Sequence, residues 1–170
     1  MGDASGELLE LGWYELIGGE LVLKPPKNRA HMVAGLLGKW LLGVYGALFV
    51  PQCPSIDGHP EDNPTNDPAP DVAVLRRSIR ELSSIPGPED LLFVAEVSST
   101  TLSFDLTVKA GLYARAGIAE YWVVDVEGRR VIVHRQPEGG LYRDVAAYGA
   151  GERMATLGAP EQTILVEELF

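Results

Sequence analysis

The pattern between residues 91 and 125 limits the possible folds of this chain more than any other feature. Leu91–Ala95 is a short apolar run of the kind that forms a buried strand, and Glu120–Asp125 is also expected to be a buried strand. Between them, Ser98–Thr101 offers good helix N-caps, and Gly117 ends the helix that follows. Strand, helix and strand in this order are typical of a parallel strand pair joined by a crossover. We therefore predict an α/β (mixed α+β) fold with a mixed central β-sheet flanked by helices.

Further strands and one long helix are expected around this unit. Trp13–Leu23 is typical of a hairpin with a two-glycine turn, and Asn28 can cap a helix that runs to about Tyr45. The apolar face expected for this helix consists of Met32, Leu36, Leu37, Trp40, Leu41 and Val44. Other strands are expected at 48–51, 72–75, 131–134 and 141–148. Because the pattern shows neither an internal repeat nor a second domain, residues 1–170 are expected to form one domain.

Two carboxylates lie at the ends of two predicted strands. Asp71 directly precedes the run at 72–75, and Glu96 follows Leu91–Ala95. Buried carboxylates are costly without a partner, and two close ones raise each other's pKa. A hard cation such as Mg²⁺ or Mn²⁺ relieves both problems, because it prefers carboxylate, carbonyl and water oxygens. The polar, proline-rich loop at 54–70 leads straight to Asp71 and is expected to border the same site.

Lys109 lies on the predicted helix after Glu96, beside an apolar stripe. The stripe consists of Leu102, Leu106, Tyr113 and Ala116. Two interpretations of Lys109 are open. It forms an i,i+4 pair with Asp105, worth roughly 0.3–0.5 kcal/mol, or it faces the two carboxylates. Carboxylates on adjoining strands favour the second interpretation.

Charge and composition narrow the functions further. A net charge of −10 argues against strong nucleic-acid binding through the overall field, because Lys and Arg contacts to phosphates dominate such affinity. The basic group formed by Lys24, Lys27 and Arg29 is interpreted as solvated loop and helix-end residues. A single cysteine and three histidines without close spacing argue against disulfides and against a Cys- or His-based zinc site. The lack of a long apolar run and of a basic leader predicts a cytoplasmic protein.

A series of motifs extends over nearly the whole chain. The motifs are Tyr14-Glu15-Leu16-Ile17-Gly18-Gly19-Glu20-Leu21, His31, Pro70-Asp71-Val72-Ala73-Val74, Val94-Ala95-Glu96-Val97-Ser98-Ser99-Thr100-Thr101, the single residues Asp105, Lys109, Tyr113 and Gly117, and Glu120-Tyr121-Trp122-Val123-Val124-Asp125. In order and spacing they closely resemble the Uma-two family of restriction-endonuclease-like proteins, which is placed in the PD-(D/E)XK nuclease superfamily. The resemblance implies a restriction-endonuclease-like core with an active site at the ends of two strands.

The resemblance also implies a metal-dependent endonuclease that hydrolyses DNA phosphodiester bonds with Mg²⁺ or Mn²⁺. Asp71 and Glu96 match the acidic metal ligands of the superfamily, and the backbone carbonyl of Val97 matches a further ligand. Ser98 stands where the superfamily usually has its lysine. Relatives in which the lysine has moved to the following helix would supply it from Lys109, which would orient a water or neutralise developing charge.

Two additional residues are candidates for the site. Glu20 resembles the acidic residue that many superfamily members bring from the N-terminal region, or it is a solvent-facing hairpin residue. His31 assists near the site or packs along its helix. The resemblance further implies a homodimer, since related nucleases often pair to cut both strands. The alternative functions are a catalytically weak or inactive nuclease-like interaction module and a small-molecule-binding α/β domain.

Overall fold

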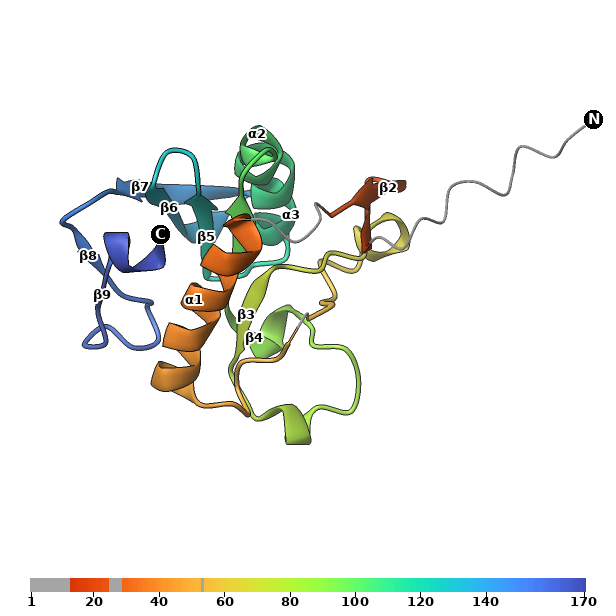
Figure 1. Cartoon of the computed structure of the whole chain (residues 1–170). Coiled ribbons are helices and arrows are strands. Elements are labelled where there is room, and N and C mark those ends of the chain that lie inside the picture. The colour runs from red at the N-terminus through yellow and green to blue at the C-terminus, as the bar shows by residue number, and fades with distance from the viewer. Residues whose placement is uncertain (1–12, 25–28, 53) are drawn as a thin grey trace, which may run out of the picture.

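A five-stranded mixed β-sheet forms the centre of the computed structural model, which describes residues 13–24, 29–52 and 54–170 (Figure 1). The strand order is β3-β4-β5-β6-β7, with β4 and β5 parallel and the other neighbouring pairs antiparallel. The pairs β1-β2 and β8-β9 form separate ribbons. The strands are β1 (Tyr14–Ile17), β2 (Glu20–Leu23), β3 (Val72–Leu75), β4 (Leu91–Ser98), β5 (Glu120–Asp125), β6 (Arg130–Glu138), β7 (Leu141–Tyr148), β8 (Arg153–Met154) and β9 (Ile164–Leu165).

Helices lie on both faces of this sheet. The helix α1 (Arg29–Tyr45) packs on one face. A broken helix packs on the other, and it consists of α2 (Leu102–Phe104), the π-helical turn η4 (Asp105–Lys109) and α3 (Ala110–Arg115). The short 3-10 helices are η1 (Asn63–Thr65), η2 (Ile79–Glu81), η3 (Pro88–Asp90) and η5 (Val166–Leu169). Among the described residues, no helix combines the length and the apolar character needed to cross a bilayer.

The two apolar layers determine where a polar site forms. Side chains of β4 alternate between them: Phe93 and Ala95 pack on the α1 side, whereas Val94 packs on the α3 side. Because side chains alternate along a strand, Glu96 lies on the same face as Val94. A carboxylate in this covered layer needs a cationic or hydrogen-bonding partner there.

The strand–helix–strand unit and the N-terminal hairpin predicted from the sequence are confirmed. The strands β4 and β5 are parallel and are joined by the broken helix. The strands β3 and β4 are direct neighbours with Val72 opposite Ala95, so Asp71 and Glu96 lie at the same end of the sheet. The hairpin turn at residues 18–19 has φ angles of +62° and +83°, which glycine adopts without steric cost and which a type I′ turn requires.

The strand predicted at residues 48–51 is wrong, because this segment forms a turn and a bend. Gly46, with φ of +87°, ends α1 and redirects the chain before the apolar run begins. The backbone carbonyl of Phe49 then accepts a hydrogen bond of 2.7 Å from the N–H of Leu75 at the end of β3. The segment therefore packs beside the sheet without joining it. The predicted cap of α1, Asn28, lies outside the described residues.

The predicted buried face of α1 is also partly wrong. The helix buries Val33, Leu37 and Leu41, whereas Met32 is 70% exposed and Leu36 is 43% exposed. The buried positions follow one another at a spacing of four, and partly buried side chains such as Ala34 and Trp40 pack beside them, so the true contact face is rotated from the predicted one. Sequence periodicity indicated an amphipathic helix but did not fix its rotation against the sheet.

Candidate active site

Five charged side chains from distant parts of the sequence meet at one end of β3 and β4. They are Glu15 of β1, Lys24 directly after β2, Asp71 directly before β3, Glu96 of β4 and Lys109 of η4, and we call them the ion cluster. Three carboxylates share two ammonium groups, so the cluster carries a net charge of −1 when every group is ionised. Only the folded chain brings these residues together.

Lys109 lies at the closed side of the ion cluster, with its side chain 3% exposed. Its Nζ lies 2.7 Å from Glu15 Oε2 and 2.8 Å from Glu96 Oε1. Burial by itself would lower the pKa of Lys109, but the carboxylates of Glu96 and Glu15 outweigh burial and raise this pKa. Lys109 is therefore a permanent cation that ties β1 and β4 to η4.

Glu96 is the centre of the ion cluster and is 2% exposed. Its Oε1 accepts hydrogen bonds from Lys109 and, at 2.7 Å, from the hydroxyl of Tyr113 in α3. Burial would raise the pKa of Glu96, but the ammonium groups of Lys109 and Lys24 outweigh burial and lower it. Glu96 is thus held as a carboxylate, with Oε2 left on the side of Lys24, 3.8 Å from that ammonium.

Asp71 and Lys24 form the more open side of the ion cluster, with side chains 29% and 20% exposed. Asp71 Oδ2 accepts a hydrogen bond of 2.8 Å from the backbone N–H of Val97, which fixes the carboxyl group at the end of β4. Asp71 Oδ1 lies 3.0 Å from Lys24 Nζ, and Lys24 also donates to the backbone carbonyl of Ala69. Burial and then the charge of Glu96 raise the pKa of Asp71, against the opposing effect of Lys24.

The chain matches a family model over most of its length. Residues 8–167 match the Uma2 (Uma-two) family, whose description is "Putative restriction endonuclease". The chain belongs to this family. No curated protein matches the chain.

Among solved structures, the chain is similar to a crystal structure described as "a putative nuclease belonging to DUF820" from Anabaena variabilis ATCC 29413. The TM-score is 0.64 at 14% sequence identity, and the match covers 92% of this chain and 89% of the other. At this identity the likeness concerns the fold alone. Together with the mixed central sheet, it confirms the fold class predicted from the sequence.

The structure brings three of the predicted site residues into one cluster. Asp71, Glu96 and Lys109 all belong to the ion cluster, and Val97 adjoins it through its N–H. The loop at 54–70 also reaches it, because the N–H of Ala69 donates to Glu15 Oε1 at 2.8 Å. The chemical roles of these residues stay predictions.

The other three candidate residues lie outside the ion cluster. Glu20 of β2 and His31 of α1 are exposed, and among the described residues no hydrogen bond or ion pair joins either of them to the cluster. Ser98 is fully buried, and its hydroxyl donates to Asp105 Oδ2 at 2.5 Å. The position at which the resemblance led us to look for a lysine therefore holds a hydroxyl that is hydrogen-bonded within the protein.

Three residues of the site are not among the predicted site residues. Glu15 is 3% exposed and lies on the same face of β1 as the buried Ile17, so strand alternation offered a signal for it. The interpretation of Lys24 as a solvated residue is wrong, because its ammonium is paired in the cluster. Tyr113 is buried in the apolar stripe as predicted, but its hydroxyl also reaches Glu96.

The π-helical turn η4 explains why Lys109 points into the ion cluster. A π turn adds a residue to the helical turn and rotates the side chains that follow, and such turns are frequent at functional sites. The i,i+4 pair with Asp105, the less favoured of the two interpretations of Lys109, does not form, since Asp105 Oδ2 accepts from Ser98 and, at 2.7 Å, from Thr101. Burial and then the charge of Glu96 raise the pKa of Asp105 to about 6. Lys109 therefore pairs with the carboxylates of Glu15 and Glu96 instead of Asp105.

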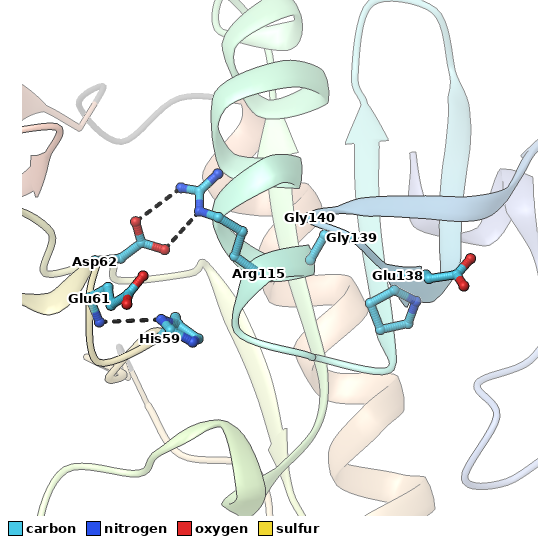
Figure 2. A pocket seen from close by; sticks show the side chains of 9 residues that line it. His59, Glu61, Asp62, Arg115, Glu138, Gly139 and Gly140 are labelled. Atoms are coloured by element: carbon cyan, nitrogen blue, oxygen red, sulfur yellow. Dashed lines mark hydrogen bonds and ion pairs between the residues drawn. The ribbon is translucent and has the colours of Figure 1, made fainter.

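A shallow depression of about 280 Å³ shares no lining residue with the ion cluster. Figure 2 shows Arg115, at the end of α3, facing Asp62, with Nε 2.8 Å from Oδ2. His59 accepts from the N–H of Glu61 at 3.2 Å, and Glu138 adds a further acidic group to the lining. Because its arginine is already paired with a carboxylate, this depression is a poor site for a phosphate.

Proposed function

We propose that this Uma2 protein is a metal-dependent endonuclease that hydrolyses DNA phosphodiester bonds at the ion cluster. Membership of a family whose description is "Putative restriction endonuclease" supports the reaction class. The single observation that carries the proposal is an arrangement of oxygens around one cation. Asp71 Oδ1, Glu96 Oε2 and the carbonyl of Ala69 all face the ammonium of Lys24. Hard divalent cations such as Mg²⁺ and Mn²⁺ prefer oxygens of these kinds.

The donor set suits an open Mg²⁺ or Mn²⁺ site. Within the described residues, no three His, Cys, Asp or Glu side chains form a complete ligand set. Mg²⁺ commonly takes only one or two carboxylates and completes its shell with waters and substrate phosphates. Asp71 and Glu96 would supply the carboxylates. Because the Val97 N–H bonds to Asp71, and the N–H and C=O of one strand residue point to the same side, the Val97 carbonyl is directed toward the same edge.

The residues of the cluster would prepare the reaction. A bound divalent cation lowers the pKa of water and stabilises charge on a phosphate. Lys109 and Tyr113 would keep Glu96 ionised and oriented, and the N–H of Val97 would orient Asp71. Lys109 would also place near the site the positive charge that the superfamily otherwise takes from the position of Ser98.

Substrate would approach from the side of Asp71. The side chains of Glu15, Glu96 and Lys109 are at most 3% exposed, whereas that of Asp71 is 29% exposed. A DNA phosphate would therefore meet Asp71 first and could not touch Lys109 Nζ without breaking buried ion pairs. Lys109 would act as a positioning residue and through its charge. With a net charge of −10, DNA affinity would be weak without the divalent cation.

Other expectations from the sequence and the resemblance stay predictions: a homodimer, a cytoplasmic location and one domain over residues 1–170. The alternative of an inactive interaction module is favoured by one observation. The Lys24 ammonium lies among the three oxygens that would bind the metal, and a lysine fixed there would keep a divalent cation out. Cleavage and metal binding together separate this alternative from the endonuclease.

A plasmid-cleavage assay tests the proposal. Supercoiled DNA is incubated with wild type, Asp71→Asn, Glu96→Gln and Glu20→Gln in Mg²⁺, in Mn²⁺ or in EDTA. Glu20→Gln is the matched control, since Glu20 is an exposed carboxylate of β2. We expect metal-dependent cleavage by wild type and by Glu20→Gln, and none by the two cluster variants. Cleavage in EDTA, or equal cleavage by Asp71→Asn, would contradict the proposal, and absence of both cleavage and Mn²⁺ binding would favour the module.

A further inference from the structure

We propose that Lys24 is a built-in competitor of the divalent cation, filling the cation position between Asp71 and Glu96 and withdrawing when the ion binds. The inference rests on the proposed function, because it assumes that these two carboxylates hold the ion. It adds a residue that sets how readily the site takes up metal.

The position of the Lys24 ammonium is the first argument. Nζ lies 3.0 Å from Asp71 Oδ1 and 3.8 Å from Glu96 Oε2, and it donates to the carbonyl of Ala69. A Mg²⁺ ion bound to the same carboxylates would need ligand distances of about 2.0–2.1 Å. The ammonium and the ion would then compete for the same oxygens and the same space, so binding of the ion requires Lys24 to leave.

Charge balance gives the second argument. With Lys24 in place, the three carboxylates and two ammonium groups of the ion cluster sum to a net charge of −1. Exchange of Lys24 for a divalent cation makes the cluster neutral, whereas addition of the ion beside Lys24 makes it positive. An unbalanced charge in a mostly buried site is costly, so exchange is favoured over addition.

The two lysines of the cluster differ in their freedom to move, which gives the third argument. Lys109 is 3% exposed and bonded to both Glu15 and Glu96. Lys24 follows the last residue of β2 and is 20% exposed. A lysine stem is long and flexible, so the Lys24 ammonium can reach water by side-chain rotation while Lys109 stays paired.

Calorimetric titration with Mn²⁺ tests the competition on the full-length chain. The variants are Lys24→Met, which keeps the apolar stem, Lys24→Gln, which keeps hydrogen-bond donors, and the control Lys39→Met. Lys39 is exposed on α1, so its removal makes the same change in net charge away from the cluster. We expect a Kd for Mn²⁺ about two- to fivefold lower in both Lys24 variants, the scale of one partly exposed ion pair. Lys39→Met should bind like wild type.

The possible outcomes separate this inference from the proposed function. Tighter Mn²⁺ binding confined to the Lys24 variants, or binding by these variants alone, supports competition. Equal or weaker binding by Lys24→Met and Lys24→Gln overturns competition but leaves the metal site standing. Equal tightening by Lys39→Met also overturns it, because the effect would then be one of net charge. Absence of Mn²⁺ binding in every protein overturns both. Circular dichroism tests whether each variant is folded. If Lys24→Met does not fold, the result for Lys24→Gln decides between the outcomes.

Discussion

Replacement of Lys109 by Met is expected to destabilise the protein strongly. Glu15 and Glu96 share its ammonium and are at most 3% exposed, and removal of one partner from a buried ion pair costs about 3–5 kcal/mol. Lys24 remains 3.8 Å from Glu96, and the Ala69 N–H still donates to Glu15, so we expect the lower end of this range. For a chain of this length, about 3 kcal/mol corresponds to a fall in Tm of roughly 6–12 °C.

The size of this loss should depend on pH with a definite sign. Without Lys109, burial raises the folded-state pKa values of Glu15 and Glu96 above their unfolded values. A group with a raised folded pKa contributes stability below its unfolded pKa, and this stability is lost as pH rises through the folded pKa. The deficit of Lys109→Met should therefore be small below about pH 4.5 and grow toward about pH 7.

Guanidinium chloride unfolding of wild type, Lys109→Met and Lys39→Met at acid and neutral pH measures both effects. The exposed Lys39 should change the free energy of unfolding by no more than about 0.5 kcal/mol. A second change, Glu15→Gln, should cost less in the Lys109→Met background than in wild type. A loss for Lys109→Met below about 1 kcal/mol at neutral pH, or a larger loss at acid pH, would refute the reasoning.

Two further predictions concern the neighbours of Glu96. Tyr113→Phe removes the hydroxyl that donates to Glu96 Oε1 at 2.7 Å. It should lower the free energy of unfolding by about 1.5–3 kcal/mol, the scale of a hydrogen bond to a charged group. Urea unfolding measures this loss, and an unchanged midpoint would contradict the prediction. Asp105 has a pKa raised to about 6 from 3.8, so wild-type stability should fall as pH rises through this interval. Asp105→Asn should show a flatter dependence of stability on pH between about pH 4 and 6. Parallel profiles of the two proteins would count against the raised pKa of Asp105.

The elements that the sequence predicted correctly have local signals. Each of β3, β4 and β5 contains an uninterrupted apolar run of at least four residues, and the glycine pair at 18–19 marks its turn by itself. The segment at 48–50 carries the same apolar signal, but Gly46 turns the chain before it can pair with the sheet. Periodicity indicated α1 but placed Met32 inside and left out Val33, because the rotation of a helix depends on the sheet that it meets.

The residues of the candidate site also differ in whether a local sequence signal reveals them. Asp71, Glu96 and Lys109 could be predicted from the sequence, because each lies in or beside one unit of neighbouring strands and the crossover helix. Glu15 and Lys24 come from the separate hairpin, and their partners lie 94 residues away at Lys109 and 47 residues away at Asp71. The docking of this hairpin against the loop at 54–70 decides their positions, and no periodic pattern in a single sequence encodes that contact.

Binding of a divalent cation by Asp71 and Glu96 is tested most directly by thermal unfolding with and without Mn²⁺. A ligand that binds only the folded state adds about 2.7 kcal/mol at a concentration of 100 Kd, which corresponds to roughly 5–10 °C for this chain length. We expect Mn²⁺ to raise the Tm of wild type and of Glu20→Gln, with EDTA reversing the rise, and to leave the Tm of Asp71→Asn unchanged. An equal rise in Asp71→Asn, or no rise in wild type, would contradict a metal site at the ion cluster.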